Sequence, residues 1–283
     1  MIDTELELLT LAAERPLRVR VEGPPGTLVG ERRRPTVVVL HGFKGFMHWG
    51  FFPQLSRRIV EAGWVCVSFN FSGSGIGADL LNFTAPQDFE NDTTSRQLED
   101  IAALRAALDG PSFPGVDPGR LALLGHSRGG GVALLHAAQR GDYRSIVTWA
   151  AIDEVDRLGP EANAAWRQQG YLPIENARTG QVFNLDIAAL HDVEQNADRL
   201  DIQAACGRLS TPTLVVHGSA DESVPFSAAR NIMETLPAQV GTLAKIEGAG
   251  HTFGATHPMD GEPAAFKAAV ELSLNHLRGT LEG

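Results

Sequence analysis

One serine of this chain lies in a setting that suits nucleophilic catalysis. The segment Gly125-His126-Ser127-Arg128-Gly129 fits the pattern Gly-x-Ser-x-Gly and is the only such match among the 283 residues. It lies between an apolar, strand-like run and a stretch of helical periodicity, where the two glycines allow a strained turn from strand to helix. Such a turn lifts the Ser127 hydroxyl out of a sheet and places the Arg128 N–H at a helix N-terminus, where it can stabilise an anion.

A serine hydroxyl is a weak nucleophile and needs a base that a carboxylate orients. Of the nine histidines, His251 has the most suitable position, in a glycine-rich loop between the last predicted strand and the last predicted helix. Two carboxylates compete for the orienting role. Asp221 lies in a turn after the apolar run 213–216, and Asp153 follows the run 146–150. We favour Asp221 and keep Asp153 as the alternative.

The elements that must position these residues alternate along the chain. Short apolar runs rich in β-branched residues alternate with longer stretches of helical periodicity, which is typical of a mostly parallel sheet covered by helices. The predicted strands are 36–40, 65–71, 121–124, 146–150, 213–216 and 242–246, with 17–21 as a candidate antiparallel edge strand. The predicted helices are 53–62, 93–108, 128–140, 226–236 and 263–277.

Polar motifs follow several of the predicted strands at the point where each strand ends. In an open parallel sheet the carboxyl ends of the strands face one crevice, where ligands bind. We therefore expect Phe43, Ser127, Asp221 and His251 to converge, although they are far apart in the sequence.

The segment from Asp153 to Ser210 interrupts the alternation. It is polar, contains no convincing core strand and is too long for an ordinary loop. Its aromatic residues favour an ordered cap that lines the substrate pocket. The sequence thus predicts a core of residues 1–152 and 211–283 with a cap insertion of residues 153–210, and cap residues Trp166, Tyr171 and Phe183 at the substrate.

Composition limits the partners of the protein. The 34 acidic and 24 basic residues give a net charge of −10, and nucleic acid is not an expected partner because phosphate binding needs a basic surface. The run Arg32-Arg33-Arg34 is predicted to be a solvated loop.

No stretch approaches the ~18 apolar residues of a membrane span, and residues 1–10 lack the features of a signal peptide. Two cysteines are expected to be free thiols in a cytoplasmic protein, with one disulfide as the alternative.

Two further patterns are weak. The segment 73–78 fits the dinucleotide-binding pattern Gly-x-Gly-x-x-Gly/Ala, but it does not open an apolar helix in a first βαβ unit, so a glycine-rich turn is the better interpretation. His251 and His257 lie six residues apart on a loop, a spacing that supports no zinc motif.

Together these motifs resemble the α/β-hydrolase fold from Pro35 to the C-terminal helix, including the order of nucleophile, acid and histidine. The resemblance implies a mostly parallel central sheet flanked by helices, with a short cap insertion. It also implies that Ser127 is the nucleophile, His251 the general base and then acid, and Asp221 the orienting carboxylate. The backbone N–H groups of Phe43 and Arg128 would form the oxyanion hole.

Among relatives, His41-Gly42-Phe43, the segment 70–75 and the short cap are most similar to carboxylesterases and feruloyl (cinnamoyl) esterases. The resemblance implies hydrolysis of a small-molecule carboxylic ester through an acyl-enzyme, without a metal or organic cofactor. His41 would brace the oxyanion loop and would line the substrate site with Gly42. The sequence departs from the family pattern after this loop, where small or polar residues are more usual and this chain has Lys44, Phe46, Met47 and Trp49.

Three other functions remain open at this point. A thioesterase or an acyltransferase would use the same triad, and only the leaving group or the acceptor differs. A non-catalytic ligand receptor on a hydrolase scaffold is the third alternative, and it would turn over no activated ester. The sequence does not give the oligomeric state.

Overall fold

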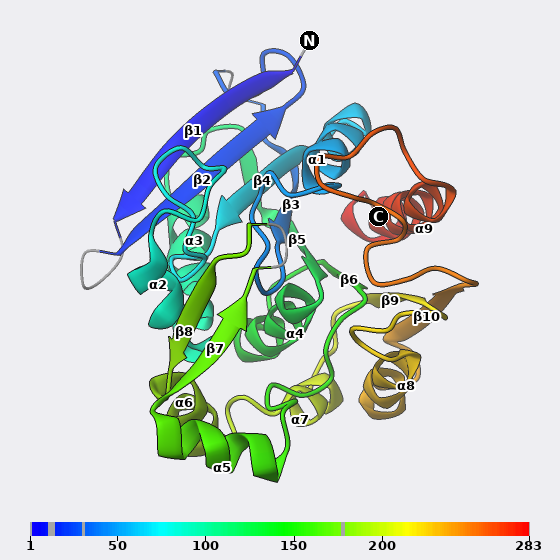
Figure 1. The fold of residues 1–283 in the computed structure, drawn as a ribbon. Coiled ribbons are helices and arrows are strands. Elements are labelled where there is room, and N and C mark those ends of the chain that lie inside the picture. The colour runs from blue at the N-terminus through cyan, green and yellow to red at the C-terminus, as the bar shows by residue number, and fades with distance from the viewer. Residues whose placement is uncertain (1, 11–14, 30–31, 177–178, 283) are drawn as a thin grey trace.

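The computed structural model describes residues 2–10, 15–29, 32–176 and 179–282. Within these residues, eight strands form one sheet in the order β1-β2-β4-β3-β5-β6-β9-β10 (Figure 1). The strands from β4 to β10 in this order run parallel, whereas β2 is antiparallel to both β4 and β1. Their bounds are β1 Asp3–Thr10, β2 Pro16–Gly23, β3 Arg34–Leu40, β4 Val65–Asn70, β5 Val116–His126, β6 Ser145–Trp149, β9 Thr213–Gly218 and β10 Gly241–Ile246.

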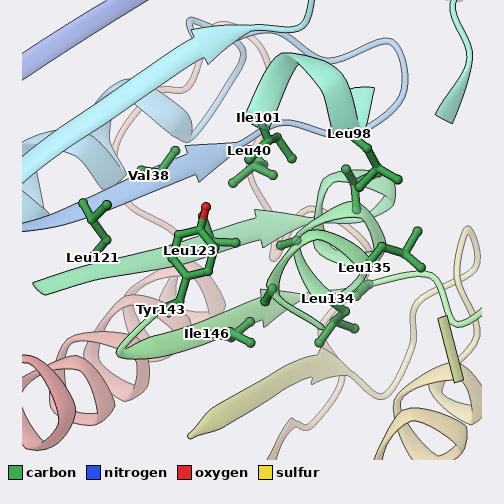
Figure 2. Close-up of a cluster of buried hydrophobic side chains, with 14 of the residues drawn as sticks. Val38, Leu40, Leu98, Ile101, Leu121, Leu123, Leu134, Leu135, Tyr143 and Ile146 are labelled. Carbon is green, nitrogen blue, oxygen red and sulfur yellow. The ribbon is translucent and has the colours of Figure 1, made fainter. Parts of the chain in front are cut away.

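Helices cover both faces of the sheet. The helices that flank it are α1 Phe52–Glu61, α3 Thr94–Asp109, α4 Arg128–Arg140, α8 Phe226–Thr235 and α9 Ala264–Leu281. Strand β3 is continuously apolar because helices cover both of its faces. Val38 and Leu40 pack with α3 and α4 on one face. Val37 and Val39 pack with α1 and α9 on the other. Figure 2 shows the first of these two clusters, in which Leu98 and Ile101 of α3 lie over the sheet.

The segment between β6 and β9 carries its own elements, which lie at the carboxyl end of the parallel strands (Figure 1). A separate two-stranded antiparallel sheet, β7 and β8, packs against the short helix α2, and α6 packs against α3. Helix α7 instead packs against α4 and α8, in the core of the sheet domain. The bounds are α2 Pro86–Glu90, α5 Pro160–Gln169, β7 Tyr171–Glu175, β8 Val182–Asp186, α6 Ala188–Gln195 and α7 Ile202–Gly207.

The structure corrects the sequence-based assignment of the sheet edge. The run 17–21 was predicted to be an antiparallel edge strand, and β2 is indeed antiparallel, but β1 pairs with it from Asp3 to Thr10 and forms the edge. The alternating acidic residues and leucines of β1 are a period-two strand pattern that the sequence analysis did not use.

Two features bear on the predicted setting of the protein. Both Cys66 and Cys206 are buried and free of a disulfide. Of the helices in the described ranges, none is both long and apolar enough to cross a membrane.

Candidate active site

Ser127 occupies a strained turn between strand and helix. Strand β5 ends at His126 and α4 begins at Arg128, so Ser127 alone joins them, with φ 55° and ψ −123°. A non-glycine residue rarely adopts a positive φ, and such strain concentrates at functional sites. The fold holds the turn by close packing: a Cβ at Gly125 would collide with the Gly129 carbonyl, and one at Gly129 would collide with the His41 carbonyl.

His251 and Asp221 meet at the same end of the sheet. His251 Nδ1 lies 2.8 Å from Asp221 Oδ2, while Asp221 Oδ1 accepts hydrogen bonds from the N–H groups of Ser223 and Val224 at 2.9 Å each. Burial would raise the pKa of Asp221, but hydrogen bonds from His217, His251 and the Val224 N–H outweigh it and hold the pKa below its ordinary value. Asp221 is therefore a carboxylate that keeps its charge and fixes the orientation of the His251 ring.

The alternative acid makes a different contact. Asp153 Oδ2 accepts a hydrogen bond of 2.7 Å from Asn231 Nδ2 on α8. The structure thus brings Asp221, and not Asp153, to His251.

A second imidazole contacts Asp221, and the sequence analysis gave it no role. His217 is fully buried, its Nε2 lies 3.4 Å from Asp221 Oδ2, and the same nitrogen donates to the Val224 carbonyl at 2.9 Å. Because that carbonyl only accepts, Nε2 carries a proton. The four-residue spacing from His217 to Asp221, at the end of a buried strand, was the signal available in the sequence.

His41 and His126 are neutral supports. The Phe71 N–H donates to His41 Nε2 at 3.1 Å, so the proton of the ring is on Nδ1, which donates to the Gly42 carbonyl at 2.9 Å. His126 Nε2 donates to the His251 carbonyl at 3.0 Å. Burial lowers the pKa of His41 to about 4 and that of His126 to about 3. His41 therefore fixes the loop before Phe43, and His126 fixes the loop that carries His251.

The loop that carries Gly42 and Phe43 packs closely against Ser127. Gly42 leaves no room for a side chain, because a Cβ there would lie 2.9 Å from the Ser127 Cβ. The next residue, Phe43, packs against Arg128, whose guanidinium carbon lies 4.0 Å from the centre of the Phe43 ring. Among the residues that the structure describes, neither the Phe43 nor the Arg128 N–H has a protein acceptor, so both are available to a bound oxygen.

Two cavities meet at Ser127 and Phe43, which line both. One, of about 220 Å³, is walled largely by residues of the 153–210 segment, and we call it the cap-side cavity. The other, of about 250 Å³, is walled by the loop 42–45 together with His126 and His251, and we call it the loop-side cavity. Ser127 thus borders an open cavity on each side.

The three aromatic residues predicted to line the pocket have different positions. Trp166 lines the cap-side cavity, whereas Phe183 packs against Phe83 and Phe89, and Tyr171 is 38% exposed. The physical reason is strand alternation, which turns Tyr171 outward. The cavity is also lined by residues of this segment that were not predicted, among them Leu172, Ile174 and Leu185 of β7 and β8.

The large residues after the oxyanion loop also separate into two groups. Phe46 and Met47 are buried in the protein, whereas Lys44 and Trp49 line the loop-side cavity. Lys44 Nζ donates to the Glu175 carbonyl at 3.2 Å and so connects the loop 42–45 to β7.

The segment 73–78, which fits the dinucleotide-binding pattern, forms turns in the structure. The Ser74 N–H donates to the Phe71 carbonyl at 2.8 Å, and the next helix begins only at Pro86. Within the described ranges, His, Cys, Asp and Glu side chains form no group of three suited to a metal ion.

Comparison with known proteins gives relatives of the same fold. The monoacylglycerol lipase of Mycolicibacterium smegmatis is 25% identical over 229 residues, which span 73% of this chain and 77% of that enzyme. A putative hydrolase from Agrobacterium vitis S4 has a TM-score of 0.72 at 19% identity over 99% of both chains. Est1E from Butyrivibrio proteoclasticus, solved with ferulic acid bound, has a TM-score of 0.69 at 18% identity, covering 95% of this chain and 96% of its own.

These similarities confirm the predicted fold class and the predicted resemblance to esterases. The profile of the alpha/beta hydrolase family matches residues 37–269, from β3 to the middle of α9. The match includes the turn at Ser127 and the loops that carry Asp221 and His251. The chain belongs to the alpha/beta hydrolase family.

Proposed function

We propose that this hydrolase cleaves carboxylic esters through an acyl-enzyme on Ser127. The observation that carries the proposal is the 2.8 Å contact between His251 Nδ1 and Asp221 Oδ2, at a cavity that Ser127 also lines in a strained turn. A hydroxyl, an imidazole and an orienting carboxylate are the groups that acyl transfer needs. The similarity to a monoacylglycerol lipase and to the fold of Est1E, solved with ferulic acid bound, also supports ester hydrolysis.

In the proposed reaction, Ser127 Oγ attacks the ester carbonyl carbon while His251 Nε2 takes the hydroxyl proton. Asp221 accepts a hydrogen bond from Nδ1–H and stabilises the imidazolium that forms. The carbonyl oxygen becomes an anion, which the N–H groups of Phe43 and Arg128 stabilise, each by about 3–4 kcal/mol. His251 then protonates the leaving alkoxide, and a water molecule releases the acid by the same steps in reverse order.

The two cavities support an assignment of the two halves of the ester. His251 lines the loop-side cavity and does not line the cap-side cavity. Because His251 protonates the leaving oxygen, the alcohol occupies the loop-side cavity. The acyl group then occupies the cap-side cavity, and the segment 153–210 acts as a cap that shapes it. His41 and Gly42 support the substrate carbonyl through the oxyanion loop.

The substrate is a small ester, since the two cavities at Ser127 have volumes of only about 220 and 250 Å³.

The two unpaired cysteines favour a reducing compartment, the cytoplasm, as the location of the protein. Burial is the main cause that raises the pKa of both thiols to about 12, which makes them poor nucleophiles.

Covalent labelling tests the assignment directly. A fluorophosphonate should add one equivalent to Ser127, because it mimics acylation of an activated serine in an oxyanion hole. Ser127→Ala should abolish the label. Label that persists in this variant, or that maps to Ser219 or Ser223, would show that the nucleophile is another residue. Rates on an oxygen ester and a thioester of the same acid then separate an esterase from a thioesterase.

A further inference from the structure

The Arg128 side chain is an incompletely paired cation in the wall of the cap-side cavity. It stacks on Phe43, lines the cavity next to Ser127, and keeps 25% of its surface exposed. Its charged partner is Asp92, but the closest approach, from Nη1 to Oδ2, is 3.6 Å, which is longer than a hydrogen bond. In the described part of the chain, none of its side-chain N–H groups has an acceptor within hydrogen-bond distance.

Asp92 is held by other groups and does not close the pair. Its Oδ2 accepts a hydrogen bond of 2.6 Å from Gln97 Nε2. Its Oδ1 packs against Gly73, where a Cβ would collide with it, and is unpartnered among the described residues. Burial raises the pKa of Asp92 to about 7, against the opposing effect of Arg128, so Asp92 gives up part of its negative charge near neutral pH.

The other polar groups of this cavity are mainly donors. The indole N–H of the buried Trp166 has no partner within the described ranges. The N-terminus of α3, which Thr93 and Thr94 bring to the cavity, is capped by the Thr93 hydroxyl and by Asp192, so it adds no free donor to this count. The other acid that lines the cavity, Asp156, already accepts from the Leu158 N–H and from Asn163 Nδ2. Donors with positive potential therefore exceed the available acceptors, which favours a ligand that brings anionic oxygen.

Granting the serine esterase activity proposed above, we propose that the acyl group of the substrate is that of a dicarboxylic acid. Its ester carbonyl lies at Ser127, and its far carboxylate binds the Arg128 guanidinium in the cap-side cavity. The planar guanidinium matches a carboxylate with two parallel hydrogen bonds. The apolar side chains of Leu172, Ile174 and Leu185 contact the methylene chain between the two ends.

Matched pairs of substrates test this inference. The monomethyl esters of succinic, glutaric and adipic acid are compared with the methyl esters of butanoic, pentanoic and hexanoic acid at constant pH. Methyl esters are used because a poorly activated leaving group limits self-cleavage by the neighbouring carboxylate. The best dicarboxylic ester should exceed its neutral counterpart in kcat/KM by roughly 10- to 100-fold, the range expected for a hydrogen bond between charged groups.

Variants of the two cavity arginines identify the residue responsible. In Arg128→Gln the ratio of the two kcat/KM values should fall to about one. Because the ratio is taken within one enzyme, any damage to the backbone donor at this position cancels. Arg128→Lys should keep part of the preference. Arg157→Gln is the matched control, since it removes the same charge from the same cavity but its side chain donates to the Ser223 carbonyl, and it should keep the full ratio.

The outcomes separate this inference from the proposed function. Equal rates on both members of each pair, or a preference lost in Arg157→Gln and kept in Arg128→Gln, would overturn the inference and leave the esterase assignment intact. No turnover of any ester and no phosphonate label on Ser127 would overturn both. Calorimetry on Ser127→Ala gives a second readout without turnover: monomethyl glutarate should bind at least tenfold more tightly than methyl pentanoate, and equal binding contradicts the inference.

Discussion

The strand-end cluster of Ser127, Asp221 and His251 and the cap segment 153–210 are held by different kinds of contact. In the strand-end cluster, backbone groups fix the residues: the Ser127 N–H donates to the Trp149 carbonyl at 2.8 Å, and two backbone N–H groups hold Asp221. In the cap, β7 and β8 pair as a separate sheet whose residues alternate between exposed and buried or half-buried. For the reaction proposed above, we infer that the fold fixes the reacting groups, while the cap supplies a wall that can vary with the substrate.

The largest expected effect comes from comparing one carboxylate of each region, Asp221 of the strand-end cluster and Asp153 at the start of the cap. Asp221→Asn should reduce kcat by roughly 10²–10⁴, because an amide at this position favours the wrong tautomer of His251. Asp153→Asn, at the start of the cap segment, should cost less than about tenfold, since Asp153 contacts Asn231 and not His251. Glu222→Gln is the local control and should be mild.

Steady-state rates on one activated ester measure all three variants, with circular dichroism to show that the fold is kept. If Asp153→Asn were the crippling change and Asp221→Asn the mild one, the acid would belong to the cap boundary and the strand-end assignment would be wrong.

The second prediction compares glycines of the two regions. Gly125→Ala should lower the free energy of unfolding by about 3 kcal/mol, because its Cβ would collide with the backbone of Gly129 and force the turn apart. Gly170→Ala, at the end of α5 in the cap, has open space around it and should cost only about 1–2 kcal/mol for its φ of 81°. Urea unfolding measures both, and equal losses would contradict the packing described for the Ser127 turn.

The core of the fold was readable from the sequence because strands such as β3, β4 and β9 are buried on both faces and therefore continuously apolar. The same strand assignments predicted that Ser127 follows a strand and that the other loops meet near it, because the carboxyl ends of parallel strands face one crevice. β1 was missed because an edge strand has a one-sided pattern of acids and leucines, and β7 because it has five residues and contains Pro173.

The cap side of the site was harder to predict. Aromatic type alone selected Tyr171 and Phe183, whereas the direction of each side chain depends on the register of a hairpin that gives no strong signal in the sequence. The contact between Arg128 and Asp92 joins residues 36 positions apart, and nothing local in either segment specifies it.

The third prediction concerns Asp92, where the cap-side cavity meets the core. Its folded pKa of about 7 lies above the ordinary value of about 3.9, so the unfolded chain ionises first as pH rises. Asp92 should therefore lower stability progressively between about pH 4 and pH 7, with no further loss above that range. Asp92→Asn removes this dependence.

Unfolding curves at several pH values give the test. The difference in stability between the wild type and Asp92→Asn should move in favour of the variant by an amount on the order of 1–3 kcal/mol from pH 4 to pH 8. Asp100, whose pKa is raised to about 6 chiefly by burial, is present in both proteins, so the part of its contribution that burial causes cancels, and only its interaction with the Asp92 charge stays in the difference. Parallel curves would show that Asp92 keeps an ordinary pKa in the folded protein.

The smallest expected effect lies within the cap itself. Trp166 is only 6% exposed and lines the cap-side cavity, whereas Tyr171 is 38% exposed and lines neither cavity at Ser127. Trp166→Ala should therefore change the relative kcat/KM values across a series of acyl groups by about three- to tenfold, since the enlarged cavity accommodates bulkier acids. Tyr171→Ala should leave the ranking within about twofold. Thermal unfolding of both variants separates a change in the cavity from a loss of the cap. An unchanged ranking in Trp166→Ala would mean that Trp166 only anchors the cap, and that the acyl group contacts the aliphatic side chains of β7 and β8 instead.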